Sequence, residues 1–222
     1  AGGGSVLVPI LLIALPHESP ATITAVALAV VFFNAYSGTI AYMRLGRINY
    51  RAGALFTLAG LPGAVLGTLL VHSIPRSLFD PLFGLLLVGI GGFLMASPVG
   101  SVRPAVGQET PAQTHARMLI GSVGSAYIAV LSSLLGIGGG IIHVPFLIRS
   151  LQMPPHIATA TSHFVLTFMA LTATTTHIVL GEFERGIAQT LSLSIGVMMG
   201  APLGAALSAR LQGSLIIRLL AL

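Results

Sequence analysis

Long apolar segments alternate with short polar connections along the chain. A membrane-spanning helix needs about 20 consecutive apolar residues. Segments near this length cover residues 21–43, 52–72, 78–96, 118–135, 156–180 and 187–207. Shorter apolar segments cover residues 6–15 and 141–151, a last one begins at residue 215, and the only long polar stretch covers residues 97–114. The pattern predicts an all-α integral membrane protein, a polytopic helical bundle.

Two glycine runs interrupt the apolar sequence where a helix would otherwise continue. The second has four glycines in the five positions from Gly136 to Gly140, and Pro145 follows it. Glycine tolerates positive φ, and proline removes a helical hydrogen bond. Irregular backbone at membrane depth is tolerated only where protein buries it or where it lines a polar cavity. The run therefore predicts a broken helix and is the best candidate for a site.

The same pattern occurs twice. The sequence GGGSVLVPIL at residues 2–11 matches GGGIIHVPFL at residues 138–147, with an offset of 138 − 2 = 136 residues. We interpret this as a duplication that forms one membrane domain: a first repeat over 1–97, a linker over 98–117 and a second repeat over 118–222. We expect the first repeat to lack its N-terminal helix and the second to be truncated. Glycine-broken segments at matching positions of two halves point to a transporter's binding site.

The arginines indicate how the repeats are oriented. If each glycine run is the turn of a hairpin, seven arginines fall on one side, namely Arg44, Arg47, Arg51, Arg103, Arg117, Arg149 and Arg210, and two on the other, Arg76 and Arg185. If each run instead lies within one broken span, six oppose three. The positive-inside rule favours the hairpin. Each repeat then has five segments, so the repeats are inverted, with the arginine-rich side in the cytoplasm of an inner or plasma membrane.

Composition supports the membrane assignment and excludes several other classes. The chain is 55% hydrophobic and 7% charged, whereas soluble domains carry about 25% charged residues. There is no cysteine, which excludes disulfides, thiolate metal sites and thiol catalysis. The net charge is +5, but the basic residues are scattered arginines at segment ends, so nucleic acid is not an expected partner. We predict no metal site and no cofactor.

The pattern GxGGGxxxVPxL in the second half, echoed as GGGxxxVPxL in the first, resembles the sulfite exporter TauE/SafE family, also called toluene-sulfonate uptake permeases. The resemblance covers essentially the whole chain. Residues Ala158 to Ser162 also resemble the family's A-x-x-T-S element, whereas the first half lacks its Thr-Ser pair. The resemblance implies a secondary transporter, not an enzyme, for a small organosulfur compound or sulfur oxyanion such as sulfite or a sulfonate.

Free amide groups and the positive end of the dipole make a helix start an anion site without any charged side chain. Each half supplies one such start, and inverted symmetry would bring the two together near the midplane. Alternatively, the glycines only permit tight packing between repeats. The candidate substrate-binding residues are Gly3, Gly4, Ser5 and Asn34 in the first half, and Gly138, Gly139, Gly140, Ile141, Thr161 and Ser162 in the second.

Other polar residues within the apolar segments carry weaker signals. Most threonines there are expected to be structural, because their hydroxyl groups can bond to helix carbonyls. His143 and His163 are candidates for a proton relay, since histidine titrates near neutral pH, although an interhelical hydrogen bond would explain each equally well. His177 lies near a helix end, where an interfacial position explains it. The predicted partners are a small anion, the lipid bilayer and a coupling proton, and the sequence sets no oligomeric state.

A second function class is an intramembrane serine hydrolase. Ala35-Tyr36-Ser37-Gly38 differs by one residue from the GxSG motif of rhomboid proteases, and histidines lie on other helices. Nucleophilic catalysis by Ser37 needs only a hydrogen-bonded histidine in a wet cavity. The motif lacks its first glycine, however, and the second half has no matching serine motif. We therefore prefer the transporter.

Overall fold

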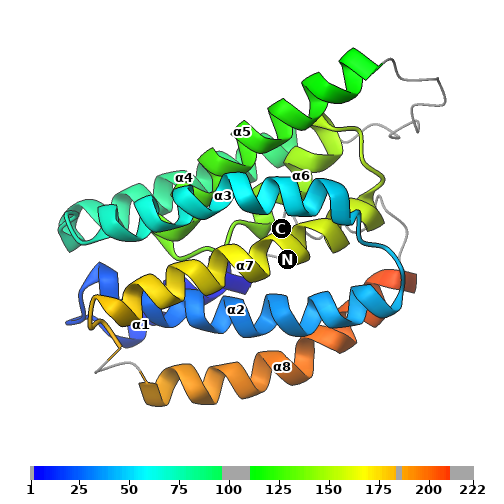
Figure 1. The fold of residues 1–222 in the computed structure, drawn as a ribbon. Coiled ribbons are helices and arrows are strands. Elements are labelled where there is room, and N and C mark those ends of the chain that lie inside the picture. The colour runs from blue at the N-terminus through cyan, green and yellow to red at the C-terminus, as the bar shows by residue number, and fades with distance from the viewer. Residues whose placement is uncertain (1–2, 97–110, 184–186, 211–222) are drawn as a thin grey trace.

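The computed structural model describes residues 3–96, 111–183 and 187–210 (Figure 1). Every regular element in these ranges is an α-helix: α1 (Gly3–Ala14), α2 (Pro20–Arg44), α3 (Tyr50–Val71), α4 (Arg76–Ala96), α5 (Pro111–Leu135), α6 (Gly140–Ser150), α7 (Pro155–Val179) and α8 (Ile187–Arg210). Helices α2, α3 and α7, and residues His115–Leu135 of α5, are long and apolar enough to cross a membrane. The prediction of an all-α integral membrane protein is confirmed.

The helix boundaries follow local chemistry. Ser19 caps α2, because its hydroxyl oxygen accepts a hydrogen bond from the Thr22 amide at 3.1 Å, and Pro20 occupies the first helical position. The Asn49 side chain caps α3 by accepting from the Ala52 amide at 3.1 Å. Each such cap contributes about 1 kcal/mol. Helix α5 begins at Pro111, so residues 111–117 belong to a helix and the expected linker 98–117 is shorter than predicted.

The equivalent helices α2 and α7 cross the middle of the bundle in opposite directions. The hydroxyl groups of Thr39, in the second half of α2, and Thr167, in the middle of α7, lie 3.0 Å apart, whereas Thr24 near the start of α2 lies 3.4 Å from His177 near the end of α7. Figure 1 shows α2 and α7 side by side, with α8 against α2 on one flank and α3 against α7 on the other. This two-fold arrangement agrees with inverted repeats.

Close packing between α3 and α5 depends on small residues. A Cβ atom on Gly63 would press into the Ala126 carbonyl, and one on Gly67 into the Val130 carbonyl. Small residues at four-residue spacing let helix backbones approach in this way. The repeat-equivalent Gly200 on α8 meets no atom of the described residues within 4 Å. The Gly63 and Gly67 pair is therefore a packing device in the first repeat.

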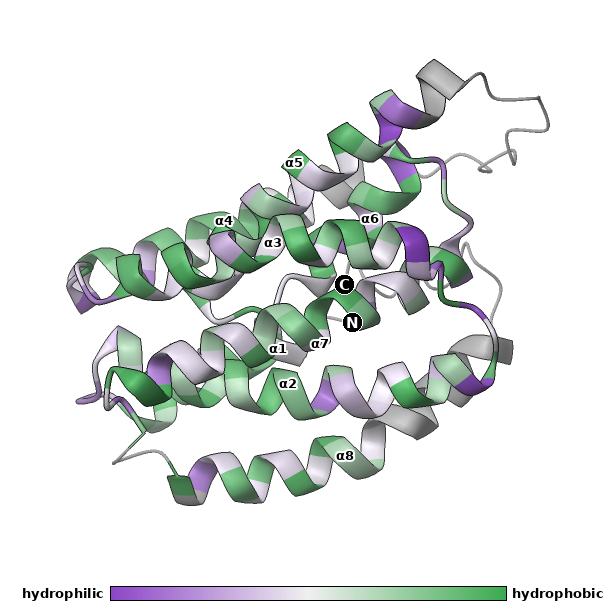
Figure 2. Ribbon diagram, in the orientation of Figure 1, coloured by the Kyte–Doolittle hydropathy of each residue, from purple (hydrophilic) through white to green (hydrophobic). Residues whose placement is uncertain are grey.

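The second glycine run is the turn of a hairpin. Gly124 of α5 lies against the Phe146 ring of α6, and Gly121 lies against Leu151 beyond α6, so the two helices run back along each other. This is the hairpin alternative of the sequence, not the single broken span. Figure 2 shows hydrophobic residues along most of each helix and hydrophilic ones concentrated towards the helix ends.

The two ends of the bundle differ in charge. Arg44, Arg47 and Arg51 surround the turn between α2 and α3, and Arg149 lies in the last turn of α6. We call this the arginine end. The opposite end, which we call the acidic end, carries His72, Arg76, Asp80, Glu18 and Glu182. Arg103, Arg185, Arg218 and Glu184 lie outside the described residues. The described part thus has the charge division that the hairpin predicts, and the side that faces the cytoplasm stays a prediction.

Candidate functional site

The break between α5 and α6 is built from glycines in a left-handed conformation. Gly136, Gly138 and Gly139 have φ values of 69°, 74° and 71°. This region costs other residues roughly 1–2 kcal/mol. Helix α5 ends with the Ile137 amide bonded to the Ser132 carbonyl at 3.1 Å, and α6 begins with the Ile142 and His143 amides bonded to the Gly139 carbonyl at 3.0 and 2.7 Å.

The backbone amide groups at the start of α6 are hydrogen-bond donors that the described residues leave without acceptors. Among the described residues no acceptor pairs with the amide groups from Gly138 to Ile141, and Gly139 provides the N-cap without a side chain. The positive end of the α6 dipole lies at the same place. Gly138, Gly139 and Gly140 are buried and Ile141 is partly buried. The predicted glycines therefore do form a protein-enclosed helix start of the kind that binds anions.

Ser132 is a residue of this site that the sequence reasoning missed. Its hydroxyl group is buried and has no hydrogen-bond partner among the residues that the structure describes. A Cβ atom on Gly139 would lie 2.5 Å from Ser132 Oγ, so the hydroxyl group covers the glycine. Its position one helical turn before Gly136 was the available signal. Serines within helices usually bond to a carbonyl of the preceding turn, as Ser122 does to Met118 at 2.9 Å.

The start of α1 lies against the same break. Gly4 is buried with its Cα facing the carbonyl groups of Gly136 and Ile137, so closely that a Cβ atom would collide with them. At Gly4 the packing interpretation of the glycines is therefore correct. Ser5 follows in the first turn and is partly buried. The structure thus brings the broken segments of the two halves together.

Asn34 of α2 lies beside the start of α1. A Cβ atom on Gly3 would lie 3.3 Å from Asn34 Nδ2. Gly3 and Asn34 line one cavity of about 170 Å³, whose other walls are apolar residues of α1, α2 and α8. Two residues predicted from separate signals therefore share one cavity.

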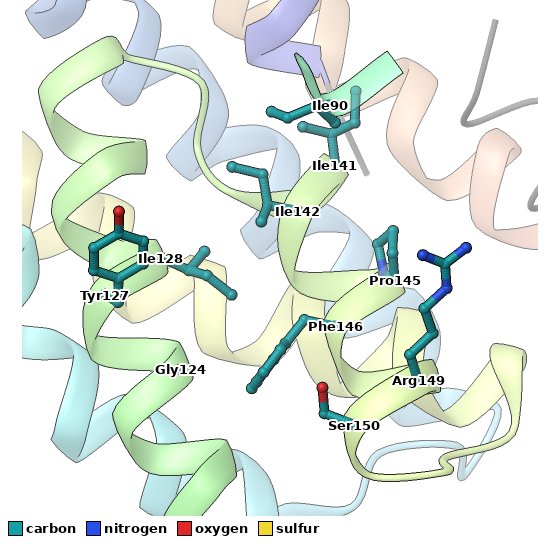
Figure 3. Close-up of a pocket in the computed structure, with 10 residues that line it drawn as sticks. All are labelled: Ile90, Gly124, Tyr127, Ile128, Ile141, Ile142, Pro145, Phe146, Arg149 and Ser150. Atoms are coloured by element: carbon teal, nitrogen blue, oxygen red, sulfur yellow. The ribbon is translucent and has the colours of Figure 1, made fainter. Parts of the chain in front are cut away.

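A second cavity of about 320 Å³ borders α6 (Figure 3). Its walls are one face of α6, together with Gly124, Tyr127 and Ile128 of α5 and Ile90 of α4. Ile141 and Ile142 lie near one end, and Arg149 and Ser150 lie near the other. Each of the two short helices α1 and α6 thus borders one cavity along its length.

Thr161 and Ser162 support neighbouring elements. The Thr161 hydroxyl oxygen accepts from the Asn49 amide at 3.1 Å and so holds the turn between α2 and α3. The Ser162 hydroxyl group lies 3.2 Å from His143 Nδ1. Both side chains are fully buried. Ser162 is linked to α6 through His143, whereas Thr161 is bonded at the arginine end.

The two proton-relay candidates are hydrogen-bonded inside the bundle. His143 Nε2 lies 2.9 Å from Ser125 Oγ, and its Nδ1 contacts Ser162, so the ring joins α5, α6 and α7. His163 Nδ1 donates to the Thr159 carbonyl of its own helix at 3.1 Å, and its ring packs edge-on against Tyr42. These contacts support the hydrogen-bonding interpretation, and a relay through either residue stays a prediction.

Ser37 lacks the partner that a hydrolase would need. Its hydroxyl group donates to the Met198 carbonyl of α8 at 3.0 Å. No histidine bonds to it within the described ranges. Gly38 beside it packs against the His163 ring. The hydrolase alternative therefore has no support in the geometry.

Comparisons with known proteins agree on a membrane transporter. The family model of the sulfite exporter TauE/SafE matches residues 1–222. The chain is 27% identical over 235 residues to the probable membrane transporter protein YunE of Bacillus subtilis, covering 99% of the chain and 85% of that protein. It is 31% identical over 158 residues to a probable membrane transporter protein of Xylella fastidiosa, covering 69% of the chain and 58% of that protein. No solved structure matches.

Proposed function

Since the chain belongs to the sulfite exporter TauE/SafE family, we propose that this multi-pass membrane transporter carries a small sulfur-containing anion, such as sulfite or a sulfonate, and binds it at the start of α6. The protein is a secondary transporter of the inner or plasma membrane, with the arginine end in the cytoplasm. The family and the relatives are named for transport, not for catalysis.

The observation that carries the proposal is the set of donors at the break. The amide groups from Gly138 to Ile141 and the Ser132 hydroxyl group are gathered at one buried place without acceptors. A buried donor without a partner costs about 1–3 kcal/mol. A tetrahedral oxyanion supplies several acceptor oxygens at once and would relieve that cost. All these donors are uncharged, so the site recognises an anion through hydrogen bonds and the helix dipole.

The packing suggests how the site reaches both sides of the membrane. Helices α1 and α6 begin together, and α1 then runs to the acidic end, where Arg76 binds its last carbonyls, while α6 runs to the arginine end. The cavity beside α1 and the cavity beside α6 are the candidate access routes. Movement of one repeat against the other would open the routes alternately, as in other inverted-repeat transporters.

Replacing Ser132 by alanine tests the site directly. A hydrogen bond to a charged group contributes about 1.5–3 kcal/mol, so Ser132→Ala should weaken anion binding roughly 10- to 100-fold. The same change removes an unsatisfied buried hydroxyl group, so thermal stability should stay equal or rise. The measurements are the dissociation constants for sulfite and small sulfonates in detergent, and counterflow of labelled anion in proteoliposomes.

Ser122→Ala is the matched control. Ser122 lies on the same helix, but its hydroxyl group is bonded to the Met118 carbonyl, so binding should not change. If Ser132→Ala binds the anion as the wild type does, the start of α6 is not the site. If no sulfur anion exchanges in the wild type, the substrate assignment is wrong.

A further inference from the structure

A cluster of titratable side chains lies at the end of the bundle opposite the arginines. His72 at the end of α3 and His177 near the end of α7 have ring centroids 5.8 Å apart. Glu182, in the turn after α7, has Oε1 3.3 Å from His72 Nδ1. We call these three residues the acid–base cluster. In the described residues no group of three or more such side chains is arranged to hold a metal ion.

The hydrogen bonds around His177 assign its proton. The Thr24 hydroxyl group donates to the Ala21 carbonyl at 3.0 Å, so towards His177 Nε2, 3.4 Å away, it acts as the acceptor. The neutral ring therefore carries its proton on Nε2. His177 Nδ1 is then a basic nitrogen, and it is buried with no hydrogen-bond partner in the described ranges. This is an unused proton acceptor inside the bundle.

The Glu182 side chain connects the second repeat to the first. Its Oε2 accepts from the Thr22 hydroxyl group of α2 at 3.1 Å, and its Oε1 lies 3.3 Å from His72 Nδ1. The contacts join Thr22, Thr24 and His72 of the first repeat to His177 and Glu182 of the second. A proton that enters the cluster therefore changes the charge between the two repeats, where relative movement would occur.

We propose that His177 is the proton-binding residue of the transport cycle, taking a proton at Nδ1, and that His72 and Glu182 exchange that proton with the water at the acidic end. The inference rests on the proposed function, because the bound proton would balance the charge of the anion at the start of α6. In the packed state described here, an N–H at Nδ1 would find no acceptor. Protonation therefore favours a state in which the end of α7 has moved relative to α2 and α3.

Among the residues that the structure describes, His72 and Glu182 are the titratable groups gathered with His177. Helix α2 presents only the hydroxyl groups of Thr22 and Thr24 to the cluster. On α4, Arg76 is bound to the carbonyls of Leu12, Leu15 and Glu18 and lies 3.5 Å from Asp80. A positive charge on His72 would disfavour protonation of His177. A negative charge on Glu182 and the negative end of the α7 dipole would favour it.

Measurement of proton-driven uptake distinguishes the role of His177 from that of the anion site. For one proton per univalent anion, a gradient of one pH unit drives about tenfold accumulation. Wild-type protein should show this accumulation in proteoliposomes. His177→Gln should only equilibrate the anion, yet keep counterflow exchange, because its anion donors are intact. The rate of exchange should lose its dependence on pH between about 5.5 and 8 in the same variant.

His156→Gln is the matched control, since His156 lies in the first turn of the same helix at the arginine end. It should accumulate the anion as the wild type does. Glu182→Gln provides a second variant in case His177→Gln folds poorly, and it should shift the pH profile. Accumulation by His177→Gln that equals the wild type overturns the proposal.

A measurement that needs no substrate distinguishes failure of the proton site from failure of the proposed transport function. The chain has no cysteine, so a single Ser73→Cys beside His72 can report the packing of this end. The rate at which this cysteine reacts with maleimide is divided by the rate for Ser150→Cys at the arginine end. This ratio of rates should be severalfold higher at pH 5.5 than at pH 8. Addition of His177→Gln should abolish that difference. A difference that persists rejects the proton site, whereas absence of anion exchange in the wild type rejects only the substrate assignment.

Discussion

At the scale of single residues, several hydroxyl groups donate to a carbonyl of the preceding turn in their own helix. Thr68 donates to the Ala64 carbonyl at 2.9 Å, and Thr175 and Thr176 donate in the same way four residues back. This is the structural role that the sequence predicts for most threonines. Ser132 lacks such a partner. The hydroxyl groups of Thr57, Thr174 and Ser194 also lack a partner in the described part of the chain, but only that of Ser132 covers Gly139 beside the amide donors at the start of α6.

Gly139 allows backbone strain to be separated from ligand binding. Gly139→Ala and Gly46→Ala both place a side chain at a positive φ, 71° and 63°, and each should lose roughly 1–2 kcal/mol of stability. Only at position 139 does the methyl group enter the donor set, since nothing lies within 4 Å of Gly46. Anion binding should therefore fail in Gly139→Ala alone, measured beside thermal unfolding in detergent. Equal binding by both variants would show that the break is only a turn.

At the scale of elements, contacts to α1 explain why Arg76 lies at the end of the bundle that is predicted to have fewer arginines. Its guanidinium donates to the carbonyls of Leu12, Leu15 and Glu18 at 2.7–2.9 Å. These carbonyls belong to the last turn of α1 and the residues after it, where a cation also complements the helix dipole. Arg76 is therefore explained by capping, and it does not count against the predicted orientation.

The glycine pairs of the two repeats should respond differently to substitution. Gly63→Ala would push a methyl group into the Ala126 carbonyl of α5, and such overpacking costs typically 1–3 kcal/mol. Gly200→Ala meets no described atom, and alanine is favoured over glycine in a helix by about 1 kcal/mol. Thermal unfolding in detergent should show a loss for the first and no loss for the second. A loss in both would mean that α8 also packs closely along this face.

At the scale of the whole molecule, the structure offers a matched pair for testing inversion. Leu45, after α2, and Leu180, after α7, are repeat-equivalent and 44% and 43% exposed. Single cysteines at these positions should be labelled by a membrane-impermeant maleimide from opposite sides of the membrane, with position 45 reached from the cytoplasm. Labelling of both from one side would contradict the inverted-repeat interpretation.

The sequence by itself determined the class of protein and the position of the break. Hydropathy and glycine or proline content are local properties, so the apolar segments and the run from Gly136 to Gly140 could be recognised without a fold. The internal match placed α1 beside α6 in the same way, and the arginines favoured a hairpin that the structure contains. The linker was predicted too long, because the helix extends into the polar residues after Pro111.

Only the tertiary structure decided which polar side chains meet. Ser132 covers Gly139, Thr161 holds the turn at Asn49 instead, and His177 lies beside His72 with one nitrogen unused. Such contacts depend on the rotation and register of each helix. These are set by close backbone packing, as at Gly63 and Gly67, and an apolar segment can present any face to its neighbours without changing its hydropathy.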